Sequence, residues 1–417
     1  MSRLTRLMAV IIVSGLLGGA AFASGYKVED QSAAAAARAN AVVARLDDPS
    51  TVFYNPAGLA YMKGLALLVG AQFVVPKFRY SDPEGKRDNA SLVTGVAVLP
   101  SLFVSYSLGR EHEWSIGFGI FAPFGIKLEY PSTWAGDTIV QSIDLQTIYF
   151  SPAVAYRPVK QVSIGVAFNL ILARLELHRN LRLPDEAGVI TGDIGMGGLS
   201  FSFNATIGVQ IRPIDKLYIG LVYKTQGYVK AKGDADFSVP EAYKAGLRDQ
   251  SISTRLFLPN QFVLGVGYQI IPQLYVEAGF EMTFWSLVQN IVIRFDEPLF
   301  GTRESETLPE RWRNTWSVRL GFEAKPISFL KLRAGFAYDR NPVPDETLSP
   351  VLPDADRVEF SVGVGYVHEK TGIFVDFSYM GVILRKRTVS AEVSESGFPQ
   401  HYNNQVHLIG LTLGLRR

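Results

Sequence analysis

Many segments of this chain alternate strictly between apolar side chains and small or polar ones. From residue 358 to residue 366, every second residue is apolar, and Glu, Ser and Gly lie between them. Similar alternation occurs at 262–268 and 331–338. A period of two places the two sets on opposite faces of a β-strand. A water-soluble β-sandwich also alternates, but its polar face would carry many more charges. The pattern therefore indicates strands whose polar side chains fill an enclosed lumen.

The connections between the candidate strands alternate in length. The expected strands lie near 64–80, 92–108, 112–130, 139–157, 160–182, 196–212, 215–233, 251–270, 273–295, 311–325, 328–340, 356–368, 372–392 and 402–415. Short connections such as 158–159 alternate with long polar ones such as 183–195. Short periplasmic turns, long outer loops and an even strand number are typical of outer-membrane barrels. We therefore predict an all-β protein, a fourteen-stranded antiparallel transmembrane β-barrel.

The start of the chain has the pattern of an export signal. Arg3 and Arg6 precede an apolar run at 7–17, and Ala21-Phe22-Ala23 fits a cleavage site. A membrane anchor is the alternative, but the apolar run is short and ends in small residues. We predict a signal peptide over residues 1–23.

Composition agrees with an exported membrane barrel. Hydrophobic residues make up 47% of the chain and charged residues 19%, with 38 Gly. No later apolar run is long enough to span a bilayer as a helix. The chain has no Cys, so no disulfide framework stabilises it, and its net charge of +2 does not indicate a nucleic-acid partner. These features favour the outer membrane of a Gram-negative bacterium.

Residues 24–63 do not follow the alternation of the strands. They contain a helix-forming run at 33–37 and a turn at Asn55, Pro56 and Ala57. The turn is flanked by apolar and aromatic residues, which is unusual for a solvated loop. We therefore predict a plug, or hatch, at 24–63 inside a barrel formed by residues 64–417.

An enzyme in the barrel is the rival class of function. The five His residues have no Ser or Asp partner at a suggestive spacing. The chain lacks Cys and any pair of the HExxH type, so metal catalysis has no support. We predict no catalytic residue, no metal and no cofactor.

Three segments carry a family resemblance. They are "YNPAG" at 54–58, "FAPFGIKLEYPSTWAGD" at 121–137 and "AGFAYDRNPVPDETLSPVLPDADRVEFSVGVGY" at 334–366. In this order they resemble the FadL-type outer-membrane transporters, the long-chain fatty acid and aromatic hydrocarbon channels. The likeness runs through essentially the whole mature chain. One departure is the C-terminus, which ends in Leu-Arg-Arg, whereas barrels of this kind commonly end in an aromatic residue.

The resemblance implies passive uptake of hydrophobic compounds through a plugged fourteen-stranded barrel. Ligand would enter from the outer loops, bind in an interior pocket and leave sideways into the outer membrane lipid. The exit would be a gap at a kinked third strand, for which the candidates are Ala122, Pro123, Phe124 and Gly125. Pro removes a ladder donor and Gly relaxes the backbone, so strand pairing should break there. An ordinary bulge near the rim is the alternative.

Long-chain fatty acids are the first expected ligand. The alternatives are uptake of monoaromatic hydrocarbons and a non-transporting outer-membrane surface protein or enzyme. An Arg pair in the pocket would favour fatty acids, whereas an all-apolar lining would favour hydrocarbons. The interior pocket needs only one chain, which is compatible with a monomer.

The resemblance also implies site residues. The ligand-binding positions would be Tyr26, Leu177, Arg179 and Arg313. For each Arg, the alternative is a lumen salt bridge or a charge that faces a loop. Arg174, Arg182, Arg319 and Arg333 are further candidates for the lumen. Asn55, Pro56 and Ala57 would form the gate, and the Asn55 amide is expected to bind unpaired strand edges beside the kink.

Overall fold

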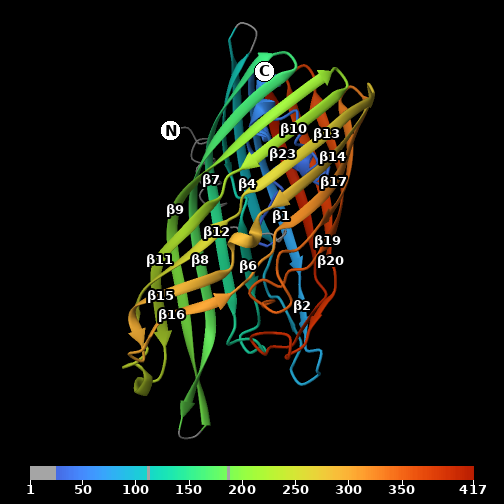
Figure 1. Cartoon of the computed structure of the whole chain (residues 1–417). Helices are drawn as coiled ribbons and strands as arrows, with labels where there is room; N and C mark the ends of the chain where they lie inside the picture. Colours follow the sequence, from blue (N-terminus) through green and yellow to red (C-terminus); the bar gives the residue numbers. More distant parts are fainter. Residues whose placement is uncertain (1–24, 110–112, 186–187) are drawn as a thin grey trace.

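The computed structural model describes residues 25–109, 113–185 and 188–417. The expected signal peptide lies outside the described residues. The remaining chain forms a closed antiparallel β-barrel (Figure 1). The first wall strand pairs with the last, from Ala66 opposite Arg416 to Lys77 opposite Gln405, and this ladder closes the barrel.

The barrel wall has fourteen strand positions, which confirms the predicted architecture. In chain order, with the two parts of a broken strand joined by "with", the wall strands are β1 (Leu65–Lys77), β4 (Ala97–Leu108), β5 (Trp114–Phe121) with β6 (Gly125–Glu129), β7 (Ser142–Val159), β8 (Val162–Asp185), β9 (Gly188–Ile214), β10 (Leu217–Lys224) with β11 (Gly227–Ser238), β12 (Gln250–Leu258) with β13 (Gln261–Ile271), β14 (Leu274–Thr283) with β15 (Asn290–Leu299), β16 (Arg303–Pro309) with β17 (Thr315–Ile327), β18 (Leu330–Asp339), β19 (Arg357–His368), β20 (Ile373–Leu384) and β23 (Gln405–Arg416).

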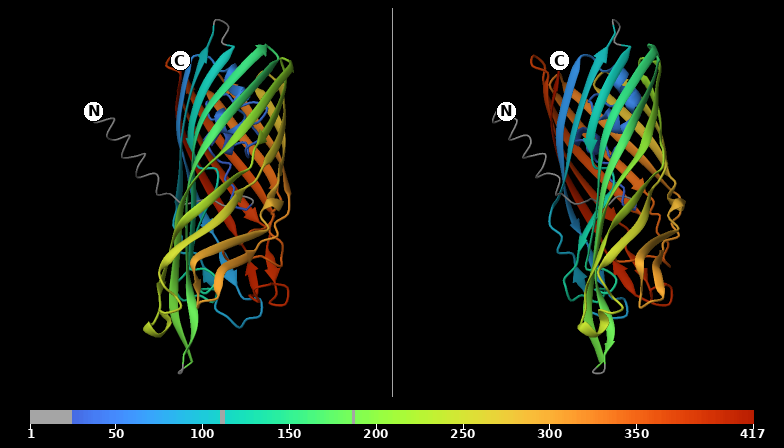
Figure 2. Two further views of the ribbon diagram at one scale, coloured as in Figure 1. Left: turned by 60° about the vertical axis from the view of Figure 1, so that its left-hand side comes forward. Right: turned by 90° about the vertical axis from the view of Figure 1, so that its left-hand side faces the viewer.

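The outer end of the barrel carries the long connections. A small sheet there joins β2 (Arg79–Ser81), β3 (Ala90–Ser91), β21 (Arg387–Val389) and β22 (Gln400–Tyr402), and the 3-10 turn η2 (Glu241–Tyr243) lies in the connection between β11 and β12. A second 3-10 turn, η3 (Trp285–Leu287), lies in the break between β14 and β15. The β8–β9 hairpin extends furthest beyond the barrel, and the C-terminus lies at the opposite end, where the turns are short (Figures 1 and 2).

The alternation in the sequence sorts side chains between lipid and lumen. In β19, Phe360, Val362 and Val364 are exposed on the outer face, whereas Glu359 and Ser361 are buried inside. The apolar set therefore faces outward, as a barrel in lipid requires, and the polar set fills the interior. None of the described helices is both long and apolar enough to cross a membrane.

The segment before β1 lies inside the barrel, where it appears as short blue helices (Figures 1 and 2). We call residues 25–64 the N-terminal segment. It contains α2 (Ala33–Ala36), α3 (Thr51–Tyr54) and the 3-10 helix η1 (Pro56–Tyr61), and most of its residues are buried. The expected simple turn at Asn55 is instead a junction between two helices, because the Asn55 side chain caps η1 by accepting from the Ala57 N–H at 3.2 Å.

Inward-facing glycines make room for this segment. A Cβ on Gly165 or Gly208 would overlap the junction at residues 55–57, and one on Gly220 would overlap the backbone of Val43. Only glycine permits such a close approach of two backbones. The abundance of Gly on the polar strand faces therefore reflects the packing of the N-terminal segment against the wall.

Candidate functional site

Strand pairing is interrupted at the third wall strand. β5 pairs with both β4 and β7, whereas β6 pairs with β7 only. The ladder between β4 and β5 ends at Leu102 opposite Ile120, and residues 97–101 of β4 pair only with β1. Contact with the third strand resumes where the Val93 N–H donates to the Glu129 carbonyl at 2.9 Å. A gap in the ladder thus lies beside residues 122–125, which we call the kink.

The N-terminal segment occupies the backbone positions that the missing strand neighbour leaves free. The Val28 N–H donates to the Pro123 carbonyl at 2.7 Å, and the Gly125 N–H donates to the Tyr26 carbonyl at 2.8 Å. Residues 26–28 therefore pair with the kink as a short antiparallel bridge centred on Lys27 and Phe124.

Gln31 completes this contact through its side chain. Its amide nitrogen donates to the Ala122 carbonyl at 3.2 Å, and its amide oxygen accepts from the Ala122 N–H at 3.3 Å. The amide thus reproduces the pair of hydrogen bonds that a neighbouring strand would make. Sequence reasoning missed Gln31, because nothing in its local pattern distinguishes it from other polar residues.

Asn55 lies elsewhere, which corrects the expectation that its amide binds beside the kink. Its amide nitrogen donates to the Val43 carbonyl at 2.8 Å and to the Val209 carbonyl of β9 at 3.2 Å. The neighbouring Ala57 carbonyl accepts from the Ser163 hydroxyl of β8 at 2.9 Å, and Pro56 packs beside Gly165. The junction packs there because the glycines of β8 and β9 leave space for it.

A cavity of about 380 Å³ adjoins the kink on the inner side of the wall. Tyr26 of the N-terminal segment and Ile126 of β6 both line it, so the cavity reaches the gap. Most of the remaining lining is aliphatic, and includes Ile139, Ile143, Leu145, Leu175, Leu177, Met196, Ile252, Leu256, Ile291, Ile293, Leu308, Val343, Leu348, Val351 and Leu352. A concave, largely apolar lining with a few polar groups is the usual form of a small-molecule site.

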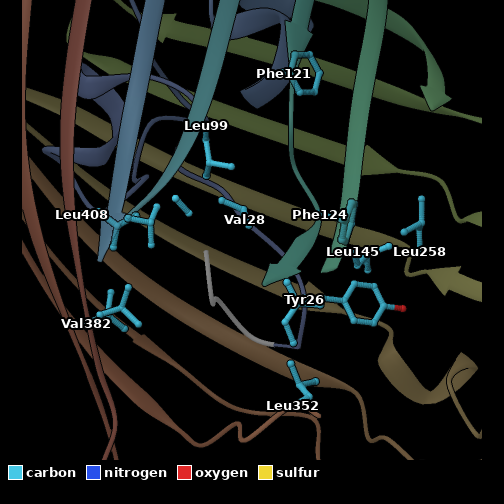
Figure 3. Packing of buried hydrophobic residues seen from close by; sticks show 14 of the residues in the cluster. Tyr26, Val28, Leu99, Phe121, Phe124, Leu145, Leu258, Leu352, Val382 and Leu408 are labelled. Carbon is cyan, nitrogen blue, oxygen red and sulfur yellow. The ribbon is translucent and has the colours of Figure 1, made fainter. Parts of the chain in front are cut away.

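Tyr26 is fixed between the cavity and the kink. Its hydroxyl donates to the Phe257 carbonyl, and its ring packs against Trp285 and Trp312 at centroid distances of 5.0 and 5.5 Å. Phe124 of the kink packs against it at 6.1 Å. Figure 3 shows Tyr26 below Phe124, with Leu145, which also lines the cavity, beside Phe124. Aromatic pairs at these distances are attractive beyond their buried area, so Tyr26 links the cavity lining to the gap.

The cavity has one basic side chain among the described residues, and it is already paired. The Arg179 guanidinium lies 2.6 Å from the Glu306 carboxylate, and both side chains are largely buried. Of the four predicted ligand-binding residues, Tyr26, Leu177 and Arg179 line the cavity.

Arg313 does not line the cavity, which corrects its expected place in the pocket. Its side chain is exposed, and the neighbouring Trp312 points inward instead. The reason is local: Arg311 has a φ of 48°, so the chain turns just before Trp312. Trp312 itself was missed as a site residue, although it lies next to the predicted position in "ERWRNTW".

Acidic groups also lie at the cavity. Glu310, Glu346 and Glu395 contribute to its lining. Glu310 lies in the segment between β16 and β17, outside the wall strands, and accepts from the Trp312 indole N–H at 2.7 Å. Burial raises the pKa of the Glu310 carboxyl to about 7. Together with the paired Arg179, this leaves the cavity without a free positive charge among the described residues.

The other Arg candidates divide between lumen and surface. Arg319 is buried and pairs with Glu29 of the N-terminal segment and with Glu281 of β14, the latter at 3.2 Å. Arg333 is buried between Asp376 and Glu323, at 2.6 and 2.7 Å. Arg174 and Arg182 are exposed instead. The Arg319 cluster also includes Lys27, the residue after Tyr26, so ion pairs hold the start of the N-terminal segment against the wall.

The sequence of this chain matches the model of a known protein family. Residues 14–416 match the family described as "Outer membrane protein transport protein (OMPP1/FadL/TodX)". The chain belongs to this family. The family places the protein in the outer membrane as a channel for hydrophobic substrates, and its members are transporters rather than enzymes. The predicted family, location and transport class are thereby confirmed.

Individual relatives of the family match about nine tenths of the chain or more at low identity. A long-chain fatty acid transport protein of Salmonella typhi is 24% identical over 405 residues, covering 89% of this chain and 91% of that protein. The crystal structure of a Pseudomonas aeruginosa FadL homologue superposes with a TM-score of 0.84 at 19% identity, covering 94% of this chain and 100% of that one. The toluene transporter TodX of P. putida gives a TM-score of 0.74 at 17% identity, with 93% and 98% covered. At these identities the solved structures support the fold of the OMPP1/FadL/TodX family and leave the ligand open.

Proposed function

We propose that this channel takes up hydrophobic compounds by binding them in the apolar cavity and releasing them sideways through the gap at the kink. The observation that carries the proposal is the continuity of the two: Tyr26 and Ile126 belong to the cavity lining and also border the gap. The hatch expected at 24–63 would be the element that moves, because residues 26–31 are what covers the gap.

The level of the gap in the membrane supports a lateral exit. The kink lies beside Ile148 of β7, which is opposite Leu172 of β8, and Leu172 is opposite Phe201 of β9. Two residues further toward the outer end of β7 and β8, the pair that faces the same side is polar, with Gln146 opposite Arg174. The gap therefore lies at the outermost apolar level of the wall, where the outer leaflet begins.

The physical chemistry of the ligand favours the same route. An apolar molecule loses the hydrophobic stabilisation of the cavity if it enters water, and keeps it if it enters lipid. The route through the lumen is filled by the N-terminal segment and its buried ion pairs. Release into the membrane is consequently the lower-energy path.

The cavity lining supports ligands that bind in an uncharged form. A carboxylate needs a free charge-assisted donor in an apolar site, but Arg179 is paired with Glu306 and Arg313 is outside. This favours the alternative ligand class, monoaromatic hydrocarbons and other neutral compounds, over ionised long-chain fatty acids. Fatty acids would bind best as their protonated acids.

Closing the kink tests the exit route. The double substitution Pro123→Val and Gly125→Val restores a ladder donor and stiffens the backbone, so β5 and β6 should join. We expect uptake of a radiolabelled hydrophobic compound by whole cells to fall by about tenfold or more, while binding to the purified protein stays unchanged. The matched control is Pro158→Val, since Pro158 is exposed near a short turn, away from the kink. Normal uptake by the kink variant would refute the lateral exit.

Ligand charge is tested separately by comparing oleate with methyl oleate. Trp285 and Trp312 flank Tyr26, so indole fluorescence reports binding. We expect methyl oleate and toluene to bind the purified protein, and the ester to bind at least as tightly as oleate at neutral pH. Oleate binding about tenfold tighter than the ester would show instead that a carboxylate is recognised, since that ratio corresponds to about 1.4 kcal/mol.

A further inference from the structure

A group of four basic side chains lies on the outer face of the wall, away from the cavity. Lys230 and Lys232 of β11, Arg255 of β12 and Arg294 of β15 are all exposed, and we call them the basic cluster. The three strands lie side by side on the part of the wall that extends outward (Figure 1). The opposite face of these strands lines the cavity, so the basic cluster is separate from the ligand site.

The strand register brings the four charges together. Lys230 is directly opposite Arg255, and Lys232 is directly opposite Ser253. Ser253 is in turn opposite Arg294 on the next strand. Since neighbouring strands are about 4.8 Å apart, Lys232 and Arg294 are separated by about 10 Å at the backbone. The cluster is therefore a patch of molecular dimensions with a hydroxyl at its centre.

The charges of the cluster are not neutralised by the protein. Within the described ranges, none of the four side chains forms an ion pair. Lys230 and Arg255 instead lie 5.3 and 5.6 Å from the ring of Tyr228. Asp234 and Asp296 lie beyond the cluster toward the outer end of the barrel, two residues after Lys232 and Arg294 respectively. Like charges directly opposite one another destabilise a sheet, so the arrangement points to an anion from outside the chain.

The side chains next to the cluster are those of a lipid-facing surface. Tyr228 of β11 and Phe257 of β12 are opposite one another, each two residues from the cluster pair Lys230 and Arg255. On the adjoining strand β9, Leu199 is opposite Lys232, and Phe201 near it is 83% exposed. Basic residues directly beyond exposed aromatic ones mark the level of lipid headgroups. The anions at that level of an outer membrane are the phosphates of the outer leaflet.

We propose that the basic cluster binds the phosphorylated headgroup of an outer-leaflet glycolipid. Arg and Lys donate charge-assisted hydrogen bonds to phosphate oxygens, and Arg does so in a bidentate manner. A patch about 10 Å wide accommodates two phosphates on one headgroup. The acyl chains lie over the exposed apolar side chains of β9. This site depends on the outer-membrane location alone, and the proposed uptake function can fail without affecting it.

Lipid binding to the purified full-length mature protein tests the proposal. The probes are diphosphoryl lipid A, monophosphoryl lipid A and inorganic phosphate, measured by native mass spectrometry from a neutral detergent. The test variant carries Lys230→Gln, Lys232→Gln, Arg255→Gln and Arg294→Gln. A control variant with the same loss of charge carries Lys160→Gln, Lys216→Gln, Lys325→Gln and Lys370→Gln, which are exposed near the short turns. All eight positions are on the surface, and heat-modifiability on gels verifies that each barrel is folded.

We expect wild-type protein and the control variant to bind diphosphoryl lipid A, and the cluster variant to bind it at least about tenfold more weakly, because Lys and Arg near an anionic lipid surface attract it electrostatically. Monophosphoryl lipid A should bind with intermediate affinity. Equal binding by the cluster variant, or an equal loss in the control variant, would overturn the site. Displacement of the lipid by inorganic phosphate at a similar concentration would overturn the lipid assignment, because the site would then recognise the free ion.

Discussion

The N-terminal segment contacts the barrel wall through two side-chain amides, and the two contacts differ in the state of the wall. Asn55 binds Val209 within β9, a strand that keeps both of its neighbours. Gln31 binds Ala122 at the kink, where the third strand has lost one neighbour. The chemistry of the two side chains is the same, but the first adds a contact to a complete ladder and the second replaces a missing one.

This difference assigns different roles to the two contacts. Releasing Asn55 would leave β9 paired as before and would cost only the stability of the N-terminal segment. Releasing Gln31 would expose the backbone of the kink and open the ladder beside the cavity. The Asn55 contact is therefore suited to hold the segment in place, and the Gln31 contact to close the gap. Substituting each amide separately tests the distinction.

The largest effect is expected for Asn55→Ala, on stability. The change removes the donor to the buried Val43 carbonyl, a second contact to the partly buried Val209 carbonyl, and the cap of η1. An unsatisfied buried group costs about 1–3 kcal/mol, so the unfolding midpoint in detergent should fall clearly. Uptake per folded molecule should stay close to wild type, since the kink is untouched.

The exposed Asn403 provides the matched control for this substitution. Asn403→Ala should change stability by no more than about 0.5 kcal/mol, as expected for a surface position. An Asn55→Ala protein with wild-type stability but altered uptake would reverse the roles assigned to the two contacts.

A smaller effect is expected for Gln31→Met, on transport. Met fills a similar volume but cannot bind the Ala122 N–H and carbonyl. The two hydrogen bonds to Ala122, of about 0.5–1.5 kcal/mol each, would be lost from the closed state. The bond from the Gln31 amide nitrogen to the Val28 carbonyl, at 3.1 Å within the N-terminal segment, is lost as well. We expect uptake to rise by about two- to tenfold, with little change in the unfolding midpoint.

Gln31→Glu helps to interpret that result, because its carboxylate can still accept from the Ala122 N–H but has no amide donor for the carbonyl. Its uptake rate should fall between those of wild type and Gln31→Met. If both Gln31 variants transport at the wild-type rate, the amide does not control the gap.

The sequence was sufficient for the parts of this molecule that depend on local pattern. The period of two located the wall strands and sorted their faces, as β19 shows, and Pro123 with Gly125 located the interruption in the third strand. The contacts of the N-terminal segment were not accessible in this way. Asn55 packs where Gly165 and Gly208 leave room, and those glycines adjoin only once the register of β8 and β9 is known.

The pocket shows the same limit at the scale of one residue. Tyr26, Leu177 and Arg179 line the cavity as expected, but the direction of Arg313 depends on the backbone turn at Arg311. A Glu partner for Arg179 more than a hundred residues away was also invisible in the sequence. The polar lining that selects the ligand therefore required the three-dimensional arrangement.

The smallest expected effect is the pH dependence of anion binding in the cavity, which involves the Tyr26 end of the N-terminal segment and not the Asn55 contact. Glu310 lies beside the Tyr26 end of the N-terminal segment, because it binds the indole of Trp312, which packs against Tyr26. Its raised pKa of about 7 means that the carboxyl is neutral below that pH and becomes negative above it. A bound anion is therefore repelled increasingly as the pH rises through about 7, whereas the Asn55 contact has no such group among its partners.

A long-chain alkyl sulfonate makes this effect measurable, since its own charge does not change in this range. We expect its affinity for the purified protein to fall about two- to fivefold between about pH 6 and pH 8, because a partly screened charge pair contributes less than about 1 kcal/mol. In Glu310→Gln the affinity should be constant, and in Asn55→Ala it should fall as in wild type. A neutral ligand such as toluene should bind equally at both pH values in all three proteins. If the sulfonate responds to pH in the same way without Glu310, the titrating group lies elsewhere, and the acidic side of the cavity does not select for uncharged ligands.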